Sequence, residues 1–196
     1  MNTIKQNQEI IYKVKNSNFI SYCYKLTHIT DVNNIIENLN NLHPQAKHIC
    51  YSYRLVENDV IKEYYYESTE PHGTAGMQIF NILTRYDIVN CLIVVVRYFG
   101  GTKLGIGLLS RSYISAAKNV IENNLIEYKC KNNYELYFPN KLLEYIKKIC
   151  LQNDIEIKDI QYIESNVHLF VLSTSKDLEI LLKIKNIKIN KKGNVE

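Results

Sequence analysis

The sequence predicts an α+β protein built from two domains that divide near residue 125. The first observation is a change of composition, because glycine is concentrated before this point and almost disappears after it. The second is the element order expected for residues 126–190, strand-helix-strand-strand-helix-strand, which is typical of ferredoxin-like domains. The third is the length of 196 residues, enough for two small domains that each have a core. We therefore expect an N-terminal domain at 1–124 and a C-terminal domain at 125–196.

Hydrophobic periodicity predicts one helix and two strands in the first third of the chain. Residues 31–42 place apolar side chains at helical spacing behind Asp31, which we expect to cap the helix. Residues 48–56 alternate in character with a period of two, which indicates a strand. The tyrosine-rich segment 61–68 is expected to pair with that strand across a turn at 57–59.

The middle of the chain predicts two further helices around a buried strand. Residues 73–86 open with glycines and a threonine and then become apolar at helical spacing. Residues 88–99 are continuously apolar and β-branched, which is typical of a strand buried on both faces. A helix is expected to begin at Gly107 and to end near Asn123.

The C-terminal domain is predicted from alternating strand and helix patterns. Residues 126–138 indicate a strand, and Pro139 is expected to open a helix over 140–151. A hairpin over 154–174 follows, and then a helix capped by Ser175 and a last strand at 186–190.

Composition excludes several classes of protein. The longest uncharged apolar run, "CLIVVV", has six residues, whereas a membrane helix needs about 20. The N-terminus has no apolar h-region, so we expect a cytoplasmic protein with no membrane partner. Five scattered cysteines with no CxxC pair predict reduced thiols, no disulfide partner and no structural zinc site. These are Cys23, Cys50, Cys91, Cys130 and Cys150.

The glycine cluster is the candidate binding site. A P-loop is excluded because Lys103 precedes Gly105, and a dinucleotide fingerprint is disfavoured because residue 110 is serine. A generic anion nest, in which glycines bring backbone amides close to a ligand, fits both "EPHGTAG" and "GGTKLGIG". Arginine recognises phosphate or carboxylate with two donors, and two of the four arginines flank the second loop. The candidate residues for binding an anion or a partner are Gly73, Thr74, Gly76, Arg97, Gly100, Gly101, Lys103, Gly105, Gly107 and Arg111.

Two interpretations of this cluster stay open at the sequence level. In the first, the two loops lie within contact distance and line a concave patch, with Arg97 at its edge. In the second, the glycines serve turns and close packing, Arg111 is a solvated cation, and Arg97 pairs with Glu67 or Glu70 as a structural clamp.

No catalytic set emerges from the remaining polar residues. The acidic loop that carries Glu67, Glu70 and His72 is better explained by turn charges than by acid–base chemistry. His48 and Cys50 have no recognisable metal-ligand spacing, so we expect no metal and no cofactor.

Four ordered segments resemble the Impact family, and in particular its bacterial YigZ branch. These are "KNSNFI" at 15–20, "HPQAKHICYSYR" at 43–54, "ESTEPHGTAG" at 67–76 and "VVVRYFGGTKLGIGLLSRSY" at 94–113. The chain departs from the family pattern at Asn18, Ser68, Thr69, Gln78 and Leu108. Leu108 stands in place of a glycine and is expected to stiffen the start of the helix and to narrow a cleft there.

The resemblance implies a fold and a role. The implied N-terminal fold is the one shared with a ribosomal small-subunit protein domain and with domain IV of elongation factor G. Family members in eukaryotes regulate translation, which implies a non-enzymatic cytoplasmic factor. Its N-terminal domain is expected to bind RNA, the ribosome or a ribosome-associated protein, and the mild net charge of +4 permits an anionic partner. The alternative is an enzyme that acts on a small phosphorylated metabolite at the paired glycine loops.

Overall fold

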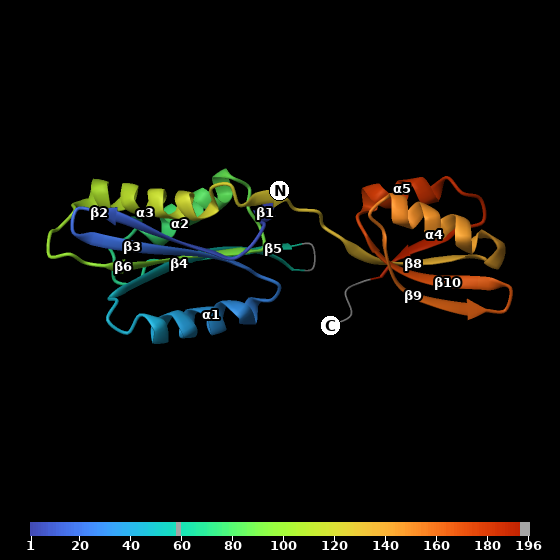
Figure 1. Cartoon of the computed structure of the whole chain (residues 1–196), viewed down its shortest axis with the longest axis horizontal. Helices are drawn as coiled ribbons and strands as arrows, with labels where there is room; N and C mark the ends of the chain where they lie inside the picture. Colours follow the sequence, from blue (N-terminus) through green and yellow to red (C-terminus); the bar gives the residue numbers. More distant parts are fainter. Residues whose placement is uncertain (58–59, 193–196) are drawn as a thin grey trace. The chain divides into compact units, whose positions relative to one another are not determined.

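The computed structural model describes residues 1–57 and 60–192, and it has a mixed architecture of sheets and helices (Figure 1). The chain divides into two compact units, Met1–Tyr128 and Lys129–Glu196. Residues 58 and 59, in the turn expected at 57–59, lie outside the described residues.

The first unit is built on a five-stranded antiparallel sheet with the order β2-β3-β6-β4-β5. Strands expected at 48–56, 61–68 and 88–99 are confirmed, whereas the first two strands were not anticipated from the pattern. The strands are β2 (Gln8–Val14), β3 (Ser17–Lys25), β4 (His48–Glu57), β5 (Val60–Tyr66) and β6 (Cys91–Tyr98).

Three helices cover the two faces of this sheet. Helix α1 (Ile29–Leu42) lies on one face, while α2 (Gly76–Arg85) and α3 (Ile106–Ile121) lie on the other (Figure 1). All three helices were predicted from periodicity. Asp31 does not occupy the N-cap of α1; it lies in the first turn, where its carboxylate accepts the backbone amide of His28 at 2.9 Å.

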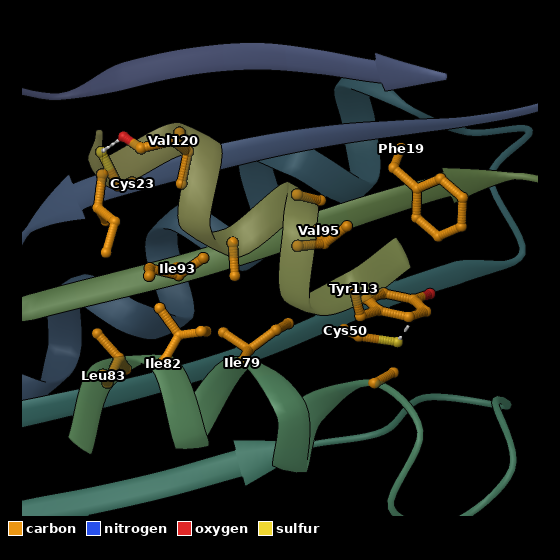
Figure 2. Packing of buried hydrophobic residues seen from close by; sticks show 14 of the residues in the cluster. Phe19, Cys23, Cys50, Ile79, Ile82, Leu83, Ile93, Val95, Tyr113 and Val120 are labelled. Carbon is orange, nitrogen blue, oxygen red and sulfur yellow. Dashed lines mark hydrogen bonds between the residues drawn. The ribbon is translucent and has the colours of Figure 1, made fainter. Parts of the chain in front are cut away.

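The central strand β6 is buried on both faces, as its sequence predicts. Ile93 and Val95 pack against Ile79 and Ile82 of α2 and the inner side of α3 (Figure 2). The alternate residues Leu92, Val94 and Val96 belong to the cluster that α1 covers. A strand in this position has no polar face, and this explains the uninterrupted apolar run.

A short strand pair joins the beginning and the end of the first unit. Strand β1 (Asn2–Ile4) pairs antiparallel with β7 (Leu125–Glu127). The single strand expected over 126–138 is therefore wrong, because β7 pairs within the first unit and the next strand begins only at Asn132.

The second unit has the predicted element order of strand-helix-strand-strand-helix-strand. Its four strands form an antiparallel sheet with the order β11-β8-β10-β9, and its core is a separate apolar cluster. Thr174 rather than Ser175 caps the second helix, since its hydroxyl accepts the amide of Asp177 at 3.1 Å. The elements are β8 (Asn132–Pro139), a 3-10 turn at Asn140–Leu142, α4 (Leu143–Gln152), β9 (Glu156–Ile163), β10 (Asn166–Ser173), α5 (Ser175–Leu182) and β11 (Lys188–Lys191).

Within the part of the chain that the structure describes, no helix has both the length and the apolar character needed to cross a bilayer.

Candidate ligand-binding site

The two glycine-rich loops of the first unit connect strands to the helices on one face of the sheet. The first loop runs from the end of β5 at Tyr66 to α2, and the second runs from the end of β6 at Tyr98 to α3. Arg97 lies near the end of β6, with Phe19 of β3 on one side of it and His48 of β4 on the other, in register. Directly opposed residues share a face of an antiparallel sheet, so these three side chains lie on the side of α2 and α3.

The amides of the first loop are occupied by the protein's own carboxylate. Glu67 accepts hydrogen bonds from the backbone N–H groups of Gly73 at 3.0 Å, Ala75 at 2.9 Å, Gly76 at 2.9 Å and Met77 at 3.1 Å. These amides form an anion nest at the N-terminus of α2, and Glu67 is the anion it holds. The expectation that "GTAG" offers free amides to a phosphate is therefore wrong.

Arg97 forms a buried ion pair with Glu70. Its Nη1 lies 2.7 Å from Oε1 of Glu70, and the two side chains are 6% and 3% exposed. The hydroxyl of Tyr113 donates to the same carboxylate oxygen at 2.9 Å, and Nδ1 of His48 lies 3.9 Å from it. The clamp considered from the sequence is thus present with Glu70, through one nitrogen rather than two.

The rest of the Arg97 guanidinium contacts aromatic rings. Its Cζ lies 5.5 Å from the ring centre of Phe19 and 5.6 Å from that of Phe99. Its Nε is buried and has no hydrogen-bond partner among the described residues. The ion pair with Glu70 therefore leaves one donor of Arg97 unsatisfied.

A pocket of about 360 Å³ lies beside Arg97. Both loops contribute to its wall, the first through Glu70 and Pro71 and the second through residues 103–106. The glycines of "GTAG" do not line the pocket. The first loop therefore contributes Glu70 and Pro71 to the wall, and the backbone amides that bind Glu67 do not face the pocket. The full lining is His48, Glu70, Pro71, Arg97, Phe99, Lys103, Leu104, Gly105, Ile106 and Leu109.

Two of the predicted glycines serve close packing instead of a ligand. A Cβ added at Gly76 would lie 2.5 Å from the carbonyl oxygen of Tyr66, and one added at Gly100 would lie 1.8 Å from that of Asn16. Thr74 is buried and donates its hydroxyl to the carbonyl of Pro71 at 2.6 Å. The packing interpretation therefore holds for these three residues.

Other predicted residues gather at the start of α3. Gly105 is its N-cap with φ of 76°, and the guanidinium of Arg111 lies close to Gly107. Lys103 and Arg111 are both exposed, and neither forms an ion pair with any described residue. Lys103 of the second loop, which also contains Gly101, and Arg111 of α3 are thus two cations near one helix N-terminus.

Most departures from the family pattern are absorbed by local contacts. Ser68 adopts a left-handed conformation, with φ of 54°, and the hydroxyl of Thr69 lies 2.8 Å from Nδ1 of His48. The side-chain amide of Gln78 donates to the carbonyl of Gly73 at 2.7 Å. Asn18 is exposed in β3. Leu108 does not line the pocket, so the narrowing expected there is not observed.

The polar groups around the pocket do not form a reactive nucleophile. Burial lowers the pKa of His48, against the opposing effect of the Glu70 carboxylate. Burial also raises the pKa of the Cys50 thiol to about 12 and that of the Tyr113 phenol well above its ordinary value. Both groups therefore stay protonated near neutral pH. Among the described residues, no three histidine, cysteine or acidic side chains gather to hold a metal ion.

The apolar part of the pocket was missed in the sequence analysis. Phe99, Leu104 and Ile106 line it, and Phe99 and Ile106 are exposed. The available signal was the presence of three large apolar residues in a loop otherwise composed of glycine, threonine and lysine.

Comparisons with known proteins agree with the resemblance. The Impact N-terminal domain matches residues 15–121. The IMPACT family member YvyE of Bacillus subtilis is 28% identical over 164 residues, which cover 83% of this chain and 75% of that protein. The IMPACT family member YigZ of Escherichia coli is 29% identical over 105 residues, which cover 53% of this chain and 52% of that protein. The crystal structure of a hypothetical protein matches with a TM-score of 0.65 and 21% identity, covering 99% of this chain and 98% of that one.

Proposed function

This chain belongs to the Impact family, and we propose that it is a non-enzymatic factor associated with the regulation of translation. The observation that carries the proposal is the match of the Impact domain over residues 15–121, which contain the whole candidate site. The family resemblance implies regulation of translation. The partner class we propose is the RNA of the ribosome, bound through the first unit.

The surface around the start of α3 supports an RNA partner. Lys103 and Arg111 are exposed and have no carboxylate partner among the described residues, and the N-terminus of α3 adds its partial positive charge. Phosphate groups are recognised by such cations, and their binding releases counterions. The proposal therefore predicts an association that weakens steeply as the salt concentration rises.

The test is co-sedimentation of the purified protein with purified bacterial ribosomes through sucrose. We expect it to pellet with ribosomes at about 50 mM salt and to be released at about 200 mM salt. Lys103→Gln combined with Arg111→Gln is expected to abolish pelleting. The control replaces Lys141 and Lys148, two exposed lysines of the second unit, with glutamine and should pellet like the parent protein. A protein that stays in the supernatant at both salt concentrations contradicts the proposal.

The structure removes one of the two observations behind the alternative, an enzyme that acts on a phosphorylated metabolite. That alternative depended on two phosphate-binding loops that face one cleft, and the amides of the first are taken by Glu67. The buried thiol of Cys50 and phenol of Tyr113 both have raised pKa values, so these described residues provide no activated group for a reaction on such a metabolite.

A further inference from the structure

The pocket beside Arg97 has apolar walls that the protein leaves uncovered. Phe99 is 49% exposed and Ile106 is 69% exposed, although both are large apolar residues. Exposed apolar side chains around a concave site are typical of a place where a ligand binds and covers them. The apolar lining is Pro71, Phe99, Leu104, Ile106 and Leu109.

The pocket also reaches the N-terminus of α3, which has no internal counter-charge. Its N-cap is Gly105, which has no side chain to accept the first amides, and its first turn contains no acidic residue. Helix α2 is different, because Glu67 accepts its N-terminal amides. The partial positive charge at the start of α3 is therefore available to an anion from outside the protein.

An unsatisfied donor provides a second and independent indication. Arg97 is 5% exposed and lines the pocket, yet its Nε has no partner among the described residues. Buried N–H groups are nearly always hydrogen-bonded in folded proteins, so this group has an unmet requirement for an acceptor. Lys103 also lines the pocket and forms no ion pair with a described residue. It therefore adds positive charge at the entrance of the pocket.

We propose that this pocket binds a small organic anion, a phosphate or a carboxylate that carries an apolar group. The anionic head is placed at the first amides of α3 beside Lys103, and the apolar group lies among Phe99, Leu104 and Ile106. Nε of Arg97 is closed off in the unliganded protein and becomes a further donor when the side chains of the pocket shift to admit the head. The volume of about 360 Å³ is at the lower end of the range of small-molecule sites. The site shares Lys103 and the N-terminus of α3 with the proposed RNA surface, but its test uses small molecules and no ribosomes, so the two proposals can fail separately.

The proposed chemistry makes a prediction about selectivity. An inorganic phosphate ion satisfies the donors but leaves the apolar walls in water, whereas a neutral aromatic alcohol does the reverse. Each is expected to bind at least about tenfold more weakly than a molecule that has both parts, because each loses one class of interaction.

The experiment is titration of the isotope-labelled full-length protein, followed through backbone amide NMR signals. The probes are phenyl phosphate, phenylacetate, inorganic phosphate and benzyl alcohol. We expect phenyl phosphate or phenylacetate to shift the amides of residues 103–108, and the tighter of the two identifies the head group. The other two probes should bind at least about tenfold more weakly. Equal Kd values for phenyl phosphate and inorganic phosphate, shifts confined to other parts of the chain, or no shifts with any probe would overturn the proposal.

Ile106→Asp tests the site without disturbing the core. The residue is exposed at the first position of α3, where a carboxylate is favourable to the helix, so the variant is expected to fold. It should weaken the binding of the better probe at least about tenfold, because it removes an apolar contact and occupies the helix N-terminus with charge. Ile180→Asp, at an exposed isoleucine in α5, is the matched control and should leave the Kd unchanged. An unchanged Kd for Ile106→Asp also overturns the proposal.

Discussion

Nη1 of Arg97 and Oε1 of Glu70 lie 2.7 Å apart, and both side chains are almost completely buried. The strand β6 provides the arginine, and the loop before α2 provides the carboxylate. This pair ties the first glycine-rich loop to the end of β6, where the second loop begins, and it forms part of the pocket wall. Of the two roles considered for Arg97 from the sequence, the structural clamp is observed, and a binding role stays a proposal.

Arg97→Met is expected to destabilise the first unit by about 3 to 5 kcal/mol, because it leaves the Glu70 carboxylate buried without its cation. Combining it with Glu70→Gln should restore part of the loss, since no unpaired charge is then buried. The measurement is urea unfolding followed through NMR signals of the first unit. Arg111→Met is the control at an exposed site and should change stability by less than about 0.5 kcal/mol. Equal effects at the two arginines would show that the buried pair contributes nothing.

Glu67→Ala is expected to lower stability by about 2 to 3 kcal/mol, because four amides at the start of α2 lose their shared acceptor. The emptied nest should then accept an anion from solution. Added phosphate is therefore expected to raise the melting temperature of Glu67→Ala more than that of the parent protein. Glu37→Ala, at an exposed position on α1, provides the control. A variant that phosphate stabilises no more than the parent argues against the nest.

Periodicity predicted the helices of the first unit because each buries an apolar face of regular spacing, and an uninterrupted apolar run predicted the central strand β6. It missed β2 and β3 because residues 8–25 mix polar and apolar side chains on an outer strand and its neighbour. It also merged β7 and β8, because the partner of β7 is β1, more than 120 residues away in sequence. Pairing at that distance leaves no local signal.

In the candidate site, too, features set by the local sequence were predicted, whereas contacts between residues distant in sequence were not. The glycine loops were predicted because glycine is rare elsewhere in this chain. The choice of carboxylate that pairs with Arg97 depends on how the first loop passes β6. The sequence pattern therefore could not distinguish Glu67 from Glu70. The structure assigns Glu70 to the arginine and Glu67 to the nest. Exposure of Phe99 and Ile106 is likewise a property of the folded chain.

Gly100→Ala and Gly101→Ala are expected to differ strongly although the two glycines are adjacent. A Cβ at Gly100 would lie 1.8 Å from the carbonyl oxygen of Asn16, so the backbone must move. At Gly101 the added Cβ meets no atom within 4 Å, and the cost comes from its φ of 83°, about 1 to 2 kcal/mol. Chemical denaturation of the two variants measures the difference. Gly101→Ala as damaging as Gly100→Ala would show that backbone strain, and not the close approach to Asn16, requires glycine here.

The buried thiols predict a loss of stability at high pH. Burial raises the pKa of Cys23 to about 11 and that of Cys50 to about 12, from an ordinary value of 9.0. In the unfolded chain these thiols ionise near pH 9, whereas in the folded protein they remain protonated. The unfolded state therefore loses protons first, and the free energy of unfolding should fall as the pH rises from about 9 towards 11.

Cys50→Ala should make that fall shallower, because one of the three buried thiols of the first unit is removed while Cys23 and Cys91 remain. The measurement is the free energy of unfolding of the first unit at pH 8, 9 and 10, each from a urea titration. The side chain of Cys50 lies in the core beside Tyr113 (Figure 2), so the variant is also expected to be less stable at every pH. The diagnostic quantity is therefore the slope and not the absolute stability. Equal slopes for the parent protein and Cys50→Ala would contradict the assignment of the alkaline loss to this thiol.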